Sequence, residues 1–171
     1  MIVADASPLI CLSKIGRLRL LRHLYNVAAI GPVVKEEVVV RGRAIRAAEV
    51  RHVEQGLQEK WIKEIQPNAR ERSLTARILK NTHLDEGEAQ SLALAKHRKL
   101  AVILDDKEAR LMAELMDIEY LGTAGVLLKA FVEGQMSFDE LEVAVRDLGK
   151  VMWLSPDVVT EILRTAREVR R

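Results

Sequence analysis

The chain has 171 residues, of which 49% are hydrophobic, 30% charged and only 4% aromatic. This length suits one compact domain, and the aliphatic bias favours helices with Val- and Ile-rich strands, while the net charge of +2 does not by itself indicate a nucleic-acid-binding protein. The sequence shows neither a cleavable signal peptide nor a run of about 18 uncharged apolar residues, so we expect a cytoplasmic protein without a membrane span.

Strand-like and helical patterns alternate through the first part of the chain. In chain order they predict a strand over 2–4, one or two helices over 8–24 interrupted at Gly16, a strand over 27–30, a helix over 32–38, an amphipathic helix over 43–59 and a strand over 61–65. The single cysteine, Cys11, lies in an apolar run and is predicted to be a small buried hydrophobe.

The same alternation continues in the second part. It predicts a helix over 70–81, a helix over 89–96, a buried strand over 100–104, a helix over 107–116, a strand over 118–121, a helix over 124–132 and two final helices that open near Ser137 and Ser155. Strands that alternate with helices indicate the α/β class, here a three-layer α/β/α sandwich with a mainly parallel central sheet.

Acidic side chains follow the predicted strands or open the helices beyond them. Active sites in open parallel sheets form at the carboxyl ends of the strands, so these residues are expected to share one edge. The acidic candidates are Asp5 after the first strand, Glu37 in the helix after Pro32, Glu88 at a helix start, and Asp105 and Asp106 after the strongest strand. Thr123, which carries a hydroxyl group, follows the last strand at the same edge.

Carboxylates gathered at one edge repel each other. At a separation of roughly 4 Å each pair costs about 4 kcal/mol, even with an effective dielectric constant near 20. Such a cluster needs raised pKa values or a cation, and hard divalent cations prefer oxygen ligands. Mg²⁺ or Mn²⁺ held there could activate water and stabilise the leaving oxygen of a phosphodiester, chemistry that requires no histidine.

Each acid also has an ordinary structural explanation. Asp5 could cap the first helix, and Glu36 and Glu37 could both be solvated surface residues. Two of the acids within residues 85–88 suit the start of a helix, whose dipole favours negative charge. The pair at 105–106 could be a turn and cap. A shared site is nevertheless favoured, because all of these residues are expected at the same edge of the sheet.

Six segments in this order resemble the successive motifs of PIN-domain proteins. They are residues 3–10, 14–16, 31–38, 87–95, 104–110 and 122–127. The resemblance implies a PIN-like nuclease domain over residues 1–135, with residues 136–171 as a helical extension packed on the same domain. The tail around residues 153–155 and 162–163 resembles a prokaryotic branch of that family related to toxin–antitoxin ribonucleases.

The resemblance also implies an activity. Proteins of this kind are Mg²⁺- or Mn²⁺-dependent ribonucleases, hydrolases that cut RNA and often act as the toxin of a toxin–antitoxin pair. The partners implied are RNA, a second copy of the chain in a homodimer and a small antitoxin protein. An alternative is a catalytically inactive PIN fold that binds RNA or protein. No Asp-x-Asp follows the first strand, as a phosphatase would need, and no Gly-x-Gly-x-x-Gly marks a Rossmann cofactor site.

Matching the family's motifs residue by residue gives the expected site. Asp5, Glu88, Asp105 and Asp106 would bind the metal, and Glu37, preferred to Glu36, would join them as a catalytic acid. The family's toxin group has Thr two residues before the fourth acid, which would select Asp106, but Leu104 stands there and strand geometry favours Asp105, so both are kept. Ser7 and Thr123 resemble the supporting hydroxyls.

Basic residues beside the acids are candidates for holding the RNA backbone. Residues 35–80 carry 11 Lys and Arg against 7 Asp and Glu. Arg41 and Arg43, which flank Gly42, are the best candidates, with Lys14 of the first helix as a third. A solvated basic face without a ligand is the alternative for each of them.

Overall fold

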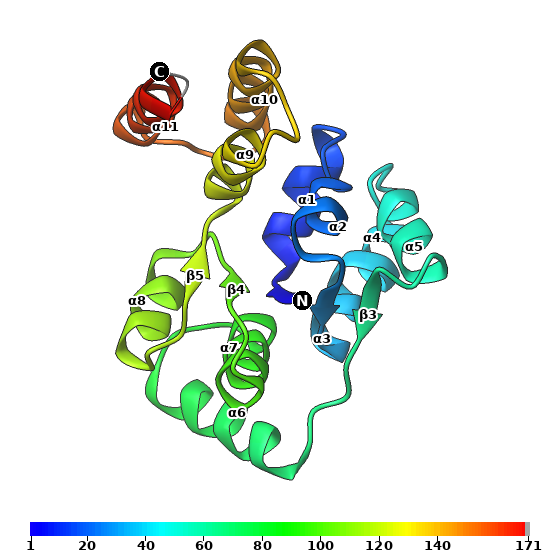
Figure 1. Ribbon diagram of the computed structural model, residues 1–171. Coiled ribbons are helices and arrows are strands. Elements are labelled where there is room, and N and C mark those ends of the chain that lie inside the picture. The colour runs from blue at the N-terminus through cyan, green and yellow to red at the C-terminus, as the bar shows by residue number, and fades with distance from the viewer. Residues whose placement is uncertain (170–171) are drawn as a thin grey trace.

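The computed structural model describes residues 1–169, and its centre is a sheet of five parallel strands (Figure 1). The strands are β1 (Ile2–Ala4), β2 (Ala28–Ile30), β3 (Ile62–Glu64), β4 (Val102–Ile103) and β5 (Tyr120–Leu121). They lie in the order β3-β2-β1-β4-β5, and every neighbouring pair is parallel. The prediction of a mainly parallel sheet is confirmed.

Helices connect the strands. They are α1 (Ala6–Lys14), α2 (Leu20–Tyr25), α3 (Pro32–Lys35), α4 (Gly42–Ala44), α5 (Val50–Gln58), α6 (Ala69–Asn81), α7 (Glu86–Arg98), α8 (Lys107–Leu115), α9 (Thr123–Val132), α10 (Phe138–Val151) and α11 (Pro156–Val169), with a π-helical turn, η1 (Glu36–Arg41), between α3 and α4. No helix within residues 1–169 is long and apolar enough to cross a membrane.

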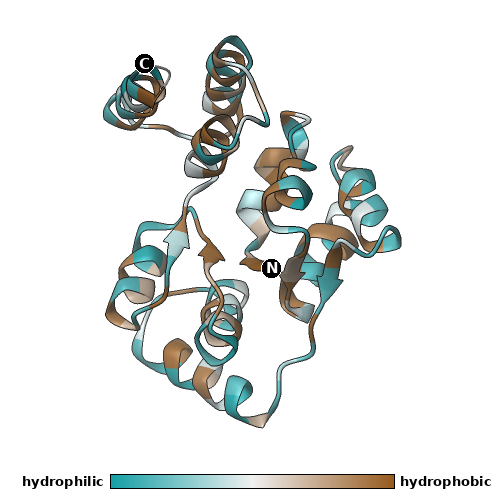
Figure 2. Ribbon diagram, in the orientation of Figure 1, coloured by the Kyte–Doolittle hydropathy of each residue, from teal (hydrophilic) through white to brown (hydrophobic). Residues whose placement is uncertain are grey.

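Alternate residues of each strand face opposite helical layers, as the pleat of a strand requires. Ile2 and Ala4 pack in a cluster with α1, α2, α5 and α9, whereas Val3 packs in a second cluster with α6, α7 and α8. Ile103 joins the first cluster and Val102 the second. The hydrophobic strand β4 accordingly runs between helices that are hydrophilic on their outer sides (Figure 2). This confirms the three-layer α/β/α sandwich.

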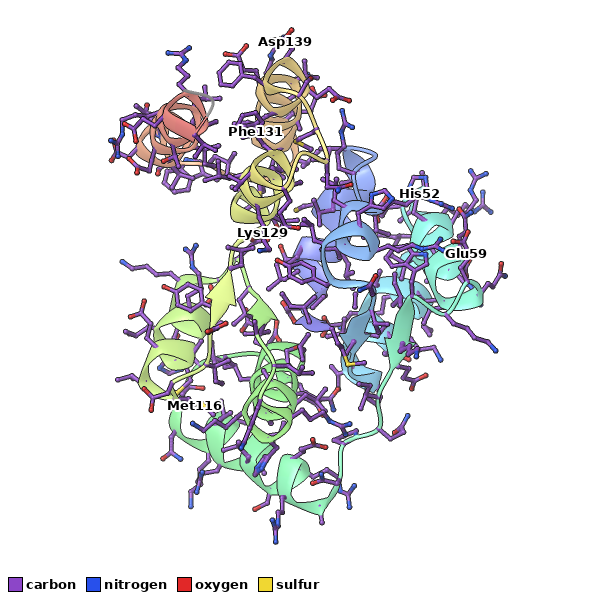
Figure 3. The ribbon with its side chains drawn as sticks, viewed as in Figure 1. His52, Glu59, Met116, Lys129, Phe131 and Asp139 are labelled. Carbon is purple, nitrogen blue, oxygen red and sulfur yellow. The ribbon has the colours of Figure 1, made fainter. Side chains whose placement is uncertain are left out.

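The two C-terminal helices extend the first layer beyond α9. Leu141 and Leu148 of α10 and Ile162 of α11 belong to the hydrophobic cluster that also contains α1. The ring of Phe131 on α9, labelled in Figure 3, meets Phe138 edge to face with centroids 6.1 Å apart. Both aromatic and aliphatic contacts therefore attach the extension to the sandwich.

The helix predicted over 43–59 is interrupted. It ends at Ala44, reverses through Arg46 at a φ of 56°, and begins again at Val50 as α5. The reason is the close approach of the two pieces: a Cβ on Gly42 would lie 2.5 Å from Cγ2 of Val50. A continuous helix could not fold back on itself in this way, so the amphipathic pattern predicted helix correctly but missed the turn.

Candidate active site

The side on which the chain adds new strands to the sheet switches between β1 and β4. From β1 the chain adds β2 and β3 on one side, and it then returns to add β4 and β5 on the other. Crevices that bind ligands form at such a switch point, beyond the carboxyl ends of the strands. Asp5 directly follows β1, and Asp105 follows β4 by one residue. Two of the predicted acids therefore flank the switch point.

Asp5 is buried, with only 6% of its surface exposed. It stands at the N-cap of α1, yet its side chain makes no capping hydrogen bond. Ser91 on α7 donates a hydrogen bond of 3.5 Å to Oδ1 of Asp5 instead. Burial raises the pKa of Asp5 to about 7, opposed by the N–H of Ala6 and assisted by the negative charges of Asp85, Glu88 and Glu37. The capping explanation does not fit this carboxyl group.

Glu37 reaches the same place from η1. Its side chain is half-buried while that of Glu36 is exposed. Oε2 of Glu37 lies 3.2 Å from the position that a Cβ of Gly87 would take in the first turn of α7. Burial raises the pKa of Glu37, and the charge of Asp85 adds to the effect while Arg41 opposes it. Wide π-helical turns frequently mark functional sites, and this one carries Glu37.

Glu88 and Asp85 form a capping box at the start of α7. The backbone N–H of Glu88 donates to Oδ1 of Asp85 at 2.8 Å, and the N–H of Asp85 donates to Oε2 of Glu88 at 3.0 Å. Burial raises the pKa of Glu88, as do the nearby charges of Asp85 and Asp106, while the bond from the Asp85 N–H opposes them. Glu88 has a structural bond through one oxygen, and Oε1 makes no hydrogen bond with any described residue.

Asp105 and Asp106 are adjacent in the sequence but accept hydrogen bonds from different parts of the structure. Asp105 receives hydrogen bonds from the backbone N–H of Thr123 at 2.8 Å, from its hydroxyl at 2.6 Å and from the hydroxyl of Ser7 at 3.4 Å. Asp106 is exposed and caps α8, accepting from the N–H of Ala109 at 2.9 Å. The structure therefore brings Ser7 and Thr123 together at Asp105, while Asp106 lies near enough to Glu88 to raise its pKa.

The acids lie near one another but do not form a closed metal cage. Within residues 1–169 no group of three or more His, Cys, Asp or Glu side chains is close enough to enclose an ion. Mg²⁺ is usually held by one or two carboxylates and several waters, so a site with few closely spaced protein ligands is compatible with it. The pKa of Asp5 is raised mainly by burial and additionally by the charges of Asp85, Glu88 and Glu37, and a bound cation would offset both effects.

Cys11 does not offer a ligand for a softer metal. It is buried, and burial together with the charge of Asp105 raises the pKa of its thiol. A neutral thiol is a weak ligand, since metals bind the thiolate. The donor set is therefore made of oxygens.

Of the three predicted RNA-binding residues, the structure leaves one unpaired. Arg41 is exposed near Glu37 and forms no ion pair with any described residue. Arg43 pairs with Glu54, and Lys14 lies 3.6 Å from Glu49. Both partners of these ion pairs come from the α5 region, which the unpredicted turn brings back toward α1 and α4.

Sequence reasoning did not include Asp85 in the cluster. The spacing between Asp85 and Glu88 predicted the start of a helix, and in the structure Asp85 is the N-cap of α7. The same carboxylate also raises the pKa values of Asp5 and Glu37. No local pattern could reveal that effect, because it depends on the approach of α7 to β1 and η1.

Residues 1–168 match a family model described as a PIN domain, so the match includes α10 and most of α11 as well as the sandwich. No curated protein matches the chain.

Proposed function

The chain belongs to the PIN-domain family, whose members are generally nucleases, and from this we infer that it is a Mg²⁺- or Mn²⁺-dependent endoribonuclease. The observation that carries the inference is that Glu37 and Glu88, both half-buried, lie near enough to the buried Asp5 at the sheet's switch point to raise its pKa. The three carboxylates come from three separate chain segments, an arrangement that helix capping alone does not require.

Asp5, Glu88, Asp105 and Asp106 would hold the metal. When bound, the ion supplies charge that activates a water and stabilises the leaving oxygen of the phosphodiester. Asp105 is kept in one orientation because Thr123 and Ser7 bind both of its oxygens. Fixed ligands of this kind avoid reorganisation during the reaction.

Glu37 is suited to proton transfer. Its raised pKa moves the carboxyl group toward neutral pH, where a general base is most effective. We assign to it the proton of the attacking water. Arg41, near Glu37 and without an ion pair to another described residue, would bind a phosphate of the substrate.

The proposed biological role is that of a toxin neutralised by a small antitoxin protein, acting in the cytoplasm as a homodimer. This role is supported by the PIN family and by the tail's resemblance to the toxin-related branch. Expression of the chain alone is expected to slow growth, and expression of the Asp5→Asn variant is not. Equal growth of cells expressing the two proteins would contradict the role as a toxin.

The activity is tested directly with purified protein and a panel of structured RNAs. We expect cleavage with Mn²⁺ or Mg²⁺, none with EDTA, and none by Asp5→Asn, which should remain folded. Cleavage that persists in EDTA would exclude the metal mechanism. Binding of RNA without cleavage in either metal would assign the chain to the inactive, binding-only type of PIN fold.

A further inference from the structure

Arg110 lies beside the candidate site, and its side chain is bound to no other residue that the structure describes. Its side chain is half-buried on α8, and it forms no ion pair or side-chain hydrogen bond with any residue between 1 and 169. Nη1 of Arg110 lies 3.5 Å from the position that a Cβ of Gly122 would take, and Oδ1 of Asp105 lies 3.5 Å from the same point. The guanidinium therefore faces the site across Gly122.

The local structure explains why Arg110 stays unpaired. Its neighbour one helical turn later is Glu114, which instead accepts a 2.5 Å hydrogen bond from the hydroxyl of Tyr120. A cation four residues before an acid is also the weaker order for such pairs in a helix. Asp105 is committed to Thr123 and Ser7 through both oxygens. Neither nearby carboxylate is therefore bound to the guanidinium.

A half-buried guanidinium loses part of its hydration and gains most from an anion that restores its hydrogen bonds. Its planar fork matches a phosphate, which can accept two parallel N–H bonds. Gly122 places no side chain between Nη1 of Arg110 and Oδ1 of Asp105, which both lie at ordinary contact distance from its Cβ position. The positive charge of Arg110, and the lack of an ion pair or side-chain hydrogen bond with any other described residue, both favour a phosphate ligand.

We propose that Arg110 binds a backbone phosphate of the RNA adjacent to the cleaved bond, an assignment that rests on the nuclease function above. Arg41 follows β2 and Arg110 follows β4, and these two strands flank β1 in the sheet. The two arginines consequently stand on opposite sides of Asp5. A single strand of RNA crossing the acids would contact one arginine on each side of the reacting phosphate.

The test measures binding separately from cleavage. A fluorescently labelled hairpin RNA is titrated in EDTA with the Asp5→Asn protein and with the same protein carrying Arg110→Gln. We expect about tenfold weaker binding in the double variant and a decrease of about 1 in the slope of log K against log salt. Arg146→Gln on α10, an exposed arginine away from the acids, removes the same charge and should leave the affinity unchanged.

Two further variants separate contact from folding. Gly122→Ala adds a methyl group at ordinary contact distance from Arg110 and Asp105 and at a φ of −86°, so the fold should remain intact while RNA binding weakens. In the active protein, Arg110→Lys should cleave better than Arg110→Gln, with the difference mainly in KM. Unchanged affinity in the Arg110→Gln double variant would overturn the assignment, as would failure of Asp5→Asn to bind the hairpin.

These outcomes also separate the inference from the proposed function. Arg110-dependent binding by a protein that cleaves no RNA would leave the phosphate contact in place and reject the nuclease. Normal cleavage by Arg110→Gln would keep the nuclease and reject the phosphate contact.

Discussion

Thr123 binds Asp105 twice, through its backbone N–H at 2.8 Å and through its hydroxyl at 2.6 Å. Thr123 is fully buried at the first position of α9, and Asp105 follows β4. The helix that follows β5 thus fixes the carboxylate that follows the neighbouring strand. These two hydrogen bonds hold Asp105 in one orientation at the end of β4, and they give the first prediction.

Thr123→Val should lower kcat/KM for RNA cleavage about tenfold to a hundredfold, because removal of a group that orients a ligand typically costs that much. The free energy of unfolding should fall by about 1–3 kcal/mol, since a buried hydrogen bond to a charged group is lost. Thr123→Ser retains the hydroxyl and is the control. Equal activity of the Val and Ser variants would contradict the orienting role.

The stability of the metal-free protein should depend on the titration of Asp5. Its folded pKa of about 7 lies above the ordinary value of 3.8, so the unfolded chain releases the proton first. Stability is therefore fully present below about pH 4 and is lost as the pH rises through 7, by about 4 kcal/mol at most.

Urea unfolding in EDTA at several pH values measures this effect. Asp5→Asn should remove the loss, so that the variant becomes more stable than the original protein at pH 8. Added Mg²⁺ should restore the stability of the original protein and have little effect on the variant. Parallel stability curves for the two proteins in EDTA would show that Asp5 is not the titrating group.

Gly87→Ala should weaken cleavage without loss of stability. The new methyl group would lie 3.2 Å from Oε2 of Glu37 and 3.3 Å from Oδ1 of Asp85, so both carboxylates must move slightly. Alanine also favours the helix by up to about 1 kcal/mol. The measurements are kcat/KM and the melting temperature.

A matched control for this change is Gly149→Ala on α10. A Cβ at Gly149 would meet nothing within 4 Å, so the same helix-favouring substitution should stabilise the protein and leave cleavage unchanged. An equal loss of activity in the two variants would refute the positional argument for Gly87.

Glu71 and Arg98 form an ion pair that joins α6 to α7. Glu71 is completely buried, and Arg98 binds both of its carboxylate oxygens, at 2.8 and 3.1 Å. Arg98→Gln should destabilise the protein by about 3–5 kcal/mol, because it leaves a buried charge without its partner. Arg70→Gln, which removes an exposed arginine from the same helix pair, should change the free energy of unfolding little.

The pH dependence of this pair has the opposite sign to that of Asp5. Burial tends to raise the pKa of Glu71, but the hydrogen bonds from Arg98 and Asn68 outweigh it and lower the pKa. The contribution of Glu71 to stability is therefore present above its ordinary pKa and is lost as the pH falls through the folded value. Urea midpoints below pH 5 should decrease more for the original protein than for Glu71→Gln, and identical decreases would contradict this.

The sheet could be predicted because each strand carries its signal locally. Residues 100–104 are a continuous apolar run followed by two acids, and such runs are typical of parallel strands buried on both faces. The positions of Asp5 and Asp105 at strand ends followed directly. The π-helical turn that carries Glu37 left no local signal, because it packs between α1 and α5, which are distant in the sequence.

The ion pairs of Arg43 and Lys14 could not be predicted either. Their partners, Glu54 and Glu49, become neighbours only because the chain reverses near Arg46. That reversal accompanies the close packing of Gly42 against Val50, a tertiary contact that the local sequence pattern does not indicate. The periodicity of the apolar residues therefore predicted a helix but not its interruption between α4 and α5.

The order in which the sheet is threaded has a consequence for biosynthesis. β1 occupies the middle of the sheet, but its neighbour β4 and the helix that steadies Asp105 are translated long afterwards. A nascent chain that has not yet reached Thr123 lacks the residue whose two hydrogen bonds fix the orientation of Asp105. The site therefore becomes complete only after β4, β5 and the start of α9 have been synthesised and have packed beside β1.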